Sequence, residues 1–198
     1  MIGLERDTVR LVPYQAGWAR LYGAEKARLQ GAVGDHVLDI QHVGSTAIPG
    51  IFAKPILDIA VAVHSFEAAY VCVAPIEALG YEYKGENGIP RRHYFVRRDP
   101  ETAQTIVHLH MNELGGPDWE NQVLFRDYML AHPEAAAEYT ALKRGLAAQF
   151  PRDREAYTDG KAPFIECILR LARAETTRGP ARDPSRQPPS KAEATSPG

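Results

Sequence analysis

Residues 42–63 read HVGSTAIPGIFAKPILDIAVAV and combine a Gly-Ser turn, a loop of small residues and a strongly apolar strand. The strand, predicted over residues 56–63, carries one charged side chain, Asp58. Because side chains alternate along a strand, Asp58 shares its face with Ala60 and Ala62, and these small neighbours leave room for a partner. A buried carboxylate costs free energy unless a partner or a metal takes up its charge. The segment therefore predicts either a ligand-binding Asp58 or an aspartate bonded to backbone amides at a strand end.

The turn before this strand has the composition of an anion-binding site. Gly44 can adopt a positive φ and lets a ligand approach the backbone closely. Ser45 and Thr46 supply hydroxyl groups, and Lys54 adds a positive charge just before the strand. Together with Asp58, these residues predict a phosphate-bearing ligand accompanied by a divalent metal. The alternative is an ordinary Gly-Ser turn.

The segment HVGSTAIPGIFAKPILDIAV resembles the signature of the GrpB-like proteins, a branch of the nucleotidyltransferase-fold superfamily. The resemblance extends from VRLVPYQAGWARLY near the start to FRDYMLAHPEAAAEYTALKRGLAAQFPRDREAYTDGKAPFI near the end. It implies a nucleotidyltransferase-like α/β (α+β) fold, with a mixed sheet of four to five strands, flanking helices and further C-terminal helices. We expect one such domain over residues 1–174.

The superfamily pattern implies a metal site that this chain matches only in part. The pattern has a Gly-Ser turn, a strand with two acidic residues at alternate positions, and a third acid on a later strand. Asp58 matches the first acid and is the expected catalytic and metal-binding residue. Ala60 occupies the place of the second acid, so the metal-binding set is incomplete.

A later strand, TIVHLHM at residues 105–111, places His108 and His110 on one face. Two histidines spaced in this way can chelate one metal or contact one phosphate. They lie where the superfamily carries its third acid, so one hypothesis is a rebuilt metal site formed by Asp58, His108 and His110. The alternative is a pair of partly solvated sheet histidines.

Three further residues are candidates for the same pocket. His42 directly precedes the turn and either contacts a phosphate or caps its strand. Arg92 follows a Gly-Pro loop, and its guanidinium suits bidentate phosphate binding, although a solvated hairpin end is an equal alternative. Lys161 lies in YTDGKAPF, a stretch that resembles the family, and it either closes the phosphate site or is a surface lysine.

The remaining sequence alternates between strand and helix patterns before becoming helical. Strands are predicted at residues 8–12, 37–43, 81–84, 93–97 and 105–111. Helices are predicted over residues 15–33, 65–79 and 119–131. A further helix is predicted to follow and to end at about residue 150, and a last one covers residues 163–173. Residues 175–198 contain no large apolar side chain and are rich in Pro, Ser and charge, so they are expected to form a disordered tail.

Bulk composition excludes several classes of protein. A formal net charge of −2 argues against a dedicated nucleic-acid-binding protein, which would carry a strong basic excess. Cys72 and Cys167 form neither a disulfide framework nor a metal pattern. The N-terminal sequence lacks a hydrophobic signal region, and no apolar run approaches the ~20 residues of a membrane helix. We therefore expect a cytoplasmic protein that does not associate with membranes.

The leading functional hypothesis is a nucleotidyltransferase-like protein that binds a nucleoside triphosphate with Mg²⁺ or Mn²⁺ and acts on an unknown acceptor. The missing second acid supports the alternative of a non-catalytic module that binds a nucleotide or another phosphorylated small molecule. Some relatives in this family are joined to dephospho-CoA kinase, which suggests a CoA-related ligand. A metal-dependent hydrolase built on Asp58, His108 and His110 is the least favoured hypothesis.

Overall fold

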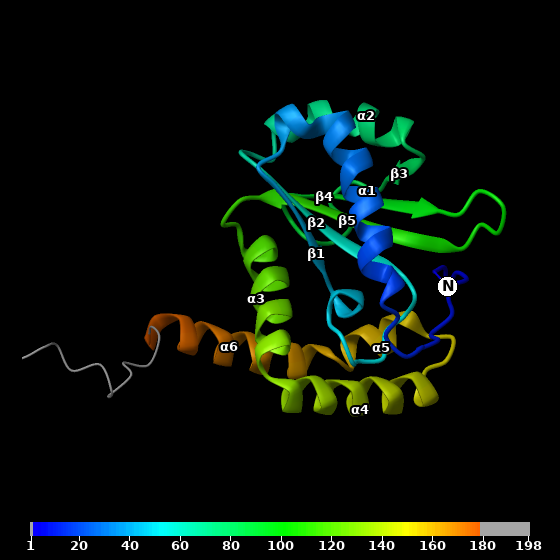
Figure 1. Cartoon of the computed structure of the whole chain (residues 1–198), viewed down its shortest axis with the longest axis vertical. Helices are drawn as coiled ribbons and strands as arrows, with labels where there is room; N and C mark the ends of the chain where they lie inside the picture. Colours follow the sequence, from blue (N-terminus) through cyan, green and yellow to red (C-terminus); the bar gives the residue numbers. More distant parts are fainter. Residues whose placement is uncertain (1, 179–198) are drawn as a thin grey trace, which may run out of the picture.

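A five-stranded mixed sheet forms the centre of the protein, and the computed structural model describes residues 2–178 of the chain (Figure 1). The strands are β1 (Asp39–Val43), β2 (Leu57–Val63), β3 (Tyr81–Tyr83), β4 (Arg92–Arg98) and β5 (Thr105–Glu113). Their order across the sheet is β1-β2-β5-β4-β3, with β2 and β5 parallel and the other neighbours antiparallel. The mixed α/β fold predicted from the sequence is confirmed.

The register of the central strands brings the predicted site residues together. Asp58 on β2 lies opposite Val43 on β1, directly before the Gly-Ser turn. On its other side, Asp58 lies opposite His108 of β5. Residues far apart in the sequence therefore meet around one carboxylate because of strand pairing alone.

One face of the sheet is covered by α1 (Gly17–Val33) and α2 (Val73–Ala78) (Figure 1). The alternate apolar residues of β2, including Ile59 and Val61, pack there against Trp18 and Leu29 of α1, and all four side chains are fully buried. Burial of a large apolar side chain contributes about 1.5–3 kcal/mol, so this layer is the main core of the domain.

The opposite face of β2 is covered by α3 (Pro117–Ala131). Trp119 of this helix packs on Val43, Ala60 and Ala62. The two alanines therefore make room for an indole ring, whereas the sequence suggested that the room was for a partner of Asp58. The difference arises because α3 follows β5 directly and returns across the sheet.

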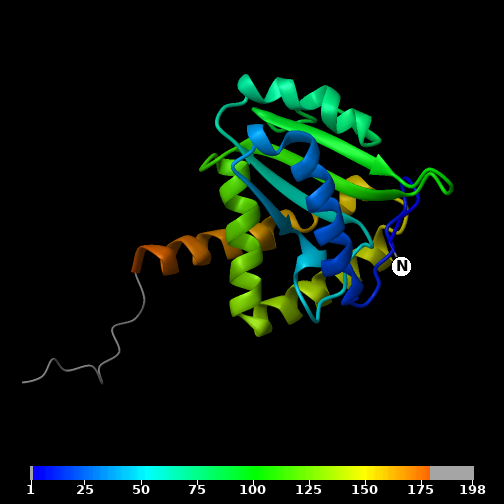
Figure 2. The same ribbon diagram turned by 45° about the horizontal axis from the view of Figure 1, so that its top comes forward.

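Three further helices form a lobe below the sheet together with α3: α4 (Pro133–Gln149), α5 (Arg154–Asp159) and α6 (Ala162–Arg178) (Figure 2). Both α3 and α4 begin with proline, whose missing N–H costs nothing in the first turn. Asp153 caps α5 by accepting a hydrogen bond from the Ala156 amide at 2.9 Å. Ile48 and Ile51, from the loop after the Gly-Ser turn, pack into this lobe and attach it to the sheet.

The ends of some predicted elements differ from the structure. Residues 8–12 form no strand, and Val12 makes only an isolated bridge to Ala53, because Pro13 offers no N–H to continue a ladder. The predicted helix 65–79 is divided into a 3-10 helix (Ala68–Cys72) and α2. Helix α6 continues to Arg178, so the first residues of the expected tail are helical, and the rest of that tail lies outside the described residues.

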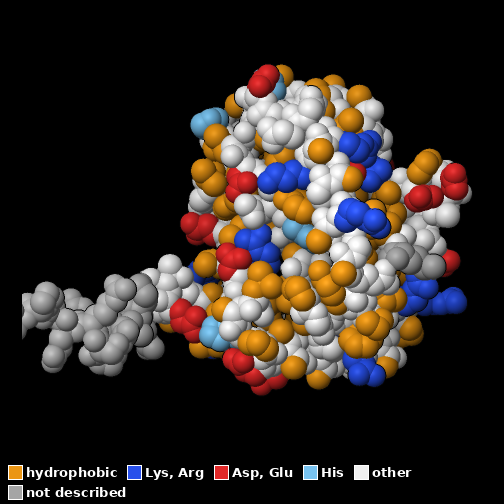
Figure 3. All heavy atoms as spheres, in the orientation of Figure 1, with side chains coloured by type: hydrophobic (Ala, Val, Ile, Leu, Met, Phe, Trp, Pro, Cys, Tyr) orange, Lys and Arg blue, Asp and Glu red, His pale blue; other side chains and the backbone are white. Residues whose placement is uncertain are grey.

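The surface is mixed in character. On the face shown in Figure 3, basic, acidic and apolar side chains are interspersed. Both cysteines are free thiols, with Cys72 buried and Cys167 half-buried.

None of the helices described within residues 2–178 has the length and apolar character needed to span a lipid bilayer.

Candidate functional site

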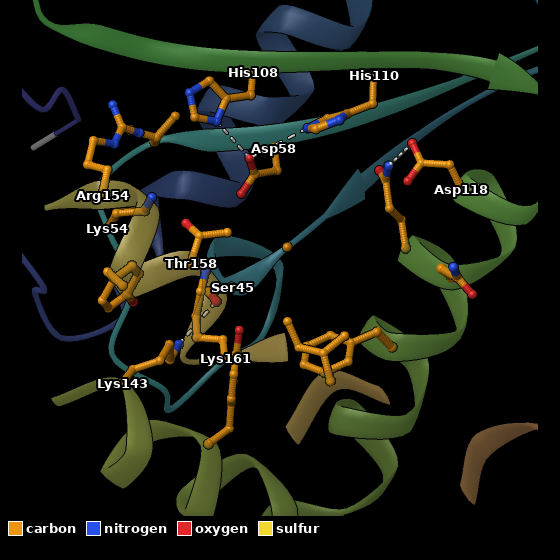
Figure 4. Close-up of a pocket in the computed structure, with 18 of the residues that line it drawn as sticks. Ser45, Lys54, Asp58, His108, His110, Asp118, Lys143, Arg154, Thr158 and Lys161 are labelled. Carbon is orange, nitrogen blue, oxygen red and sulfur yellow. Dashed lines mark hydrogen bonds and ion pairs between the residues drawn. The ribbon is translucent and has the colours of Figure 1, made fainter. Parts of the chain in front are cut away.

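A cavity of about 610 Å³ lies between the sheet and the C-terminal helices (Figure 4). Its wall contains most of the residues that the sequence singled out: Gly44, Ser45, Lys54, Asp58, His108, His110 and Lys161. The turn, the central strands and the helical lobe each contribute to the wall, so the cavity forms only when the whole domain is folded.

Gly44 and Asp58 are in direct contact. Gly44 has φ +66°, a conformation that residues with a Cβ rarely adopt. A Cβ atom at this position would lie 2.4 Å from Asp58 Oδ2, which is far inside contact distance. The Asp58 side chain is 32% exposed, so a ligand in the cavity can reach it. The sequence-based expectation that the Gly-Ser turn faces the acidic strand residue therefore agrees with the geometry.

The imidazoles of His108 and His110 approach Asp58 from the neighbouring strand (Figure 4). His108 Nδ1 lies 3.1 Å from Asp58 Oδ1, and His110 Nε2 lies 3.9 Å from the same oxygen. Burial by itself raises the pKa of Asp58, but the hydrogen bond from His108 and the nearby ring of His110 outweigh this effect and hold that pKa well below its usual range. Burial lowers the pKa of His108 despite the adjacent carboxylate. At neutral pH Asp58 is therefore charged and His108 is neutral.

Lys143 of α4 is the most deeply buried cation at this site. Its side chain is 2% exposed, lies over the ring of Tyr139, and donates hydrogen bonds to Ser45 Oγ, at 3.1 Å, and to the carbonyl oxygen of Phe52. The pKa of Lys143 is lowered to about 7, first by burial and then by the positive charges of Lys161 and Lys54. An ammonium group has three donors, so one N–H remains available to a ligand after these two bonds.

Three further cations line the cavity: Lys54 before β2, Arg154 at the start of α5, and Lys161 after α5. The pKa of Lys54 is lowered to about 7 by burial and by the charges of Lys161 and Arg154, although Asp58 raises it. The pKa of Lys161 is lowered mainly by burial. Lys54 and Lys161 both lie over the ring of Tyr157, at 5.4 Å and 4.7 Å from its centre. The cations therefore converge on one space and repel one another.

The rest of the wall is suited to the uncharged part of a ligand. Phe125 of α3 and Ile165 and Leu169 of α6 form an apolar side. Asp118 and Gln122 form a polar side next to it, where Gln122 Nε2 donates to Asp118 Oδ2 at 2.9 Å. A ligand with a charged end and an apolar, partly polar body matches this division.

Three predicted contact residues, Thr46, His42 and Arg92, lie behind the cavity wall. Thr46 is buried, and its hydroxyl is 3.0 Å from His42 Nε2. His42 stacks on Tyr22, and burial lowers the pKa of His42 to about 4. Both residues therefore support the Gly-Ser turn from behind.

Arg92 is placed in a similar way. Its side chain lies over the ring of Tyr94 and bonds the carbonyl oxygens of Glu86 and Asn87, and its guanidinium is 3.3 Å from His110 Nδ1. Unlike Lys143, Arg92 does not line the cavity, and these partners occupy its guanidinium, so it orients His110 and does not reach the cavity as the sequence suggested.

The sequence offered Lys143 only as one of several polar residues of the helical half, and neither Lys143 nor Arg154 was predicted as a site residue. Lys143 lies four residues after Tyr139, on the buried face of α4. A lysine among the buried positions of a helix is the sequence feature that indicates a functional role for Lys143. Arg154 lies in a charged run that is typical of a solvated helix face. The run becomes part of the cavity because α5 packs beside α4, which no local pattern encodes.

The lysines with lowered pKa values, Lys54, Lys143 and Lys161, make the stability of the free protein depend on pH. Lys54 and Lys143 have an ordinary pKa of 10.5, which applies to the unfolded chain, and a pKa of about 7 when folded. Between these values the unfolded chain binds more protons, so the free energy of unfolding rises with pH. We expect chemical denaturation to show a more stable wild-type protein at pH 9 than at pH 7.

The variant Lys143→Met isolates this effect, because it removes one of these lysines and keeps the other groups that titrate. Its increase in stability between pH 7 and pH 9 should be smaller than that of the wild type. An equal increase in both proteins would show that Lys143 keeps an ordinary pKa in the fold.

Comparison with known proteins identifies the family. Residues 8–171 match the family model described as GrpB protein. The chain is 42% identical over 158 residues to the UPF0157 protein YqkA of Bacillus subtilis, which covers 80% of this chain and 45% of that protein. It is 30% identical over 194 residues to a dephospho-CoA kinase of Mycolicibacterium paratuberculosis, covering 85% of this chain and 47% of that protein. The chain therefore spans about half the length of each of these two relatives.

A solved structure gives the same result at the level of the fold. The crystal structure of conserved protein GrpB from Enterococcus faecalis matches with a TM-score of 0.75 and 30% sequence identity. The match covers 82% of this chain and 96% of that chain. On the family match and these likenesses together, this chain belongs to the GrpB family.

Proposed function

We propose that the cavity binds the phosphate groups of a nucleotide, with a nucleoside triphosphate as the leading candidate. Ser45 and the available N–H of Lys143 contact the phosphates, and Lys54, Lys161 and Arg154 neutralise them. The nucleoside lies toward Phe125, Ile165 and Leu169, where the wall becomes apolar. This arrangement uses the Gly-Ser turn in the role that the nucleotidyltransferase resemblance implies.

The observation that carries the proposal is the convergence of four cations on a single cavity beside Ser45. Over residues 2–178, Lys54, Lys143, Arg154 and Lys161 take part in no salt bridge. Asp58 offsets one of these charges, and burying the others together without a further counter-ion is unfavourable. A bound polyanion removes that cost, which is the physical reason for such a set to exist in a fold.

The divalent metal ion that the sequence predicts at Asp58 remains a prediction. Over the described chain, no three His, Cys, Asp or Glu side chains are arranged to hold a metal ion by themselves. A single carboxylate, Asp58, fits a Mg²⁺ or Mn²⁺ ion only if phosphate oxygens of the ligand complete the coordination shell.

A second candidate function is binding without transfer, and the environment of Ala60 favours it. The position of the second acid in the superfamily pattern is packed against Trp119, fully buried. A site that lacks this acid lacks one of the carboxylates that hold the metal ions in two-metal nucleotidyl transfer. The dephospho-CoA kinase likeness adds dephospho-CoA to the ligands that such a binding module would take.

Calorimetric titration of the full chain tests the proposal. We expect ATP, CTP or dephospho-CoA to bind with one-to-one stoichiometry, and adenosine, which lacks phosphate, to bind at least about tenfold more weakly, because the charge-assisted bonds to phosphate are missing. The same titration with and without Mn²⁺ measures the contribution of metal.

Equal binding of ATP and adenosine would contradict phosphate recognition. Failure of all three phosphorylated ligands to bind would remove the proposal. Release of pyrophosphate from the bound triphosphate, in the presence of added hydroxyl acceptors, would distinguish transfer from binding alone.

A further inference from the structure

The first observation concerns the place where a second metal ligand would lie. Ala60 is on the same side of the sheet as Asp58, two residues along β2, and faces the indole of Trp119 in a cluster with Val43 and Ala62. All four residues of this cluster are buried. Trp119 of α3 fills the space beside Ala60, and over residues 2–178 no group of three His, Cys, Asp or Glu side chains is arranged to hold a metal ion. The donors that a two-metal centre requires therefore do not fit this sheet.

The second observation concerns the protons on the two histidines. Arginine only donates, so His110 Nδ1, 3.3 Å from the Arg92 guanidinium, acts as the acceptor, and the ring carries its proton on Nε2, which faces Asp58. His108 Nδ1 likewise donates to Asp58 Oδ1. Both imidazoles thus direct N–H groups, not lone pairs, at the carboxylate. A metal held jointly by Asp58 and these nitrogens would need lone pairs in both places.

The third observation is the charge of the wall. Asp58 and Asp118 are the acidic residues that line the cavity in the described chain, and Asp118 lies 4.0 Å from the buried Arg92. When protonated, Lys54, Lys143, Lys161 and Arg154 supply four positive charges against the one negative charge of Asp58. A bound polyanion favours the protonated lysines, and the net positive charge then offsets most of the charge of a triphosphate without a divalent ion.

We propose that the cavity takes its phosphate chain as a free polyanion, and that Lys54, Lys143, Lys161 and Arg154 occupy the role that divalent metal has in the superfamily pattern. The inference rests on the proposed function and adds the chemical form of the ligand: a metal-free triphosphate or diphosphate ester. Asp58, hydrogen-bonded to His108 and lying 3.9 Å from His110, then positions the Gly-Ser turn and repels the ligand slightly.

The sign of the effect of Asp58→Asn separates this inference from metal binding. Asparagine keeps the size of the side chain and removes the negative charge that faces the phosphates. We expect the affinity for ATP in excess EDTA to increase about three- to tenfold, since a unit charge at cavity distances contributes on that order. A metal ligand at this position predicts the opposite, a sharp loss of affinity that appears only when Mg²⁺ or Mn²⁺ is present.

The experiment is a calorimetric titration of the full chain with ATP, first in EDTA and then in excess Mg²⁺. The proteins compared are the wild type, Asp58→Asn, and the control Glu138→Gln, which removes one negative charge from an exposed position on α4. We expect the wild type to bind ATP in EDTA at least as tightly as in Mg²⁺, and Glu138→Gln to behave like the wild type.

Each outcome decides a separate claim. Binding by the wild type that requires Mg²⁺ overturns the inference and leaves the proposed function intact, and this comparison does not depend on the folding of any variant. Weaker binding by a folded Asp58→Asn protein in EDTA also overturns it. Absence of ATP binding under both conditions removes the proposed function, and the inference with it.

Discussion

Replacement of Lys143 by methionine is expected to weaken triphosphate binding about 10- to 100-fold, because a hydrogen bond to a charged group contributes about 1.5–3 kcal/mol. Lys143 is nearly inaccessible from outside the fold and is bonded to Ser45, so its charge is directed into the cavity. Methionine has a similar length and fills the same space without the charge. Calorimetric titration with ATP measures the loss directly.

The same substitution is expected to leave the fold intact. A buried cation without a carboxylate partner costs free energy, so its removal offsets the lost bonds to Ser45 and Phe52. The midpoint of thermal unfolding at pH 7 should therefore be unchanged or higher. Lys84→Met is the matched control, because Lys84 pairs with Glu82 away from the cavity. ATP affinity equal to that of the wild type in both variants would contradict the assigned role of Lys143.

Substitution of Gly44 by alanine is expected to have the largest effect on both stability and binding. The backbone conformation at φ +66° and ψ −171° is essentially restricted to glycine and costs a residue with a Cβ about 1–3 kcal/mol. In addition, the new methyl group would lie 2.4 Å from Asp58 Oδ2 and 2.9 Å from Asp58 Cβ. The strand cannot yield easily, because β2 is buried on both faces, so the Gly-Ser turn must move away from Asp58 and carry Ser45 with it.

Gly50→Ala separates the two causes. Gly50 has φ +83°, and nothing lies within 4 Å of the position that its Cβ would take, so this variant has the backbone cost without the contact. Thermal unfolding should rank the proteins as wild type, Gly50→Ala and Gly44→Ala in decreasing stability, and only Gly44→Ala should lose ATP binding. Equal unfolding midpoints for the two variants would show that the contact between residues 44 and 58 has no energetic effect.

The sheet and the acidic side of the site were accessible from sequence because they are encoded locally. The apolar run around Asp58 and the His108–His110 alternation define strands, and strand pairing then has few alternatives. The Gly-Ser turn is defined by its residue types. These segments contain Gly44, Ser45, Lys54, Asp58, His108 and His110, all of which line the cavity, whereas Lys161 was predicted from the family resemblance.

The cationic side was less accessible because it depends on how helices pack. A helix such as α5 is too short for periodicity to predict it, and Asp153 is its main local signal. The buried state of Lys143 arises from the contact of α4 with the loop that follows the turn. Arg92 illustrates the converse, since its residue type suggested phosphate binding while Tyr94, His110 and backbone carbonyls occupy its guanidinium.

A crystal structure of the full chain with a bound triphosphate tests the central claim most directly. We predict that phosphate oxygens lie within hydrogen-bonding distance of Lys143 Nζ and Ser45 Oγ, with the nucleoside toward Phe125. A triphosphate that is bound with its phosphates outside this cavity, or with Lys143 contacting only Ser45 and Phe52, would contradict the assignment of this cavity as the phosphate site.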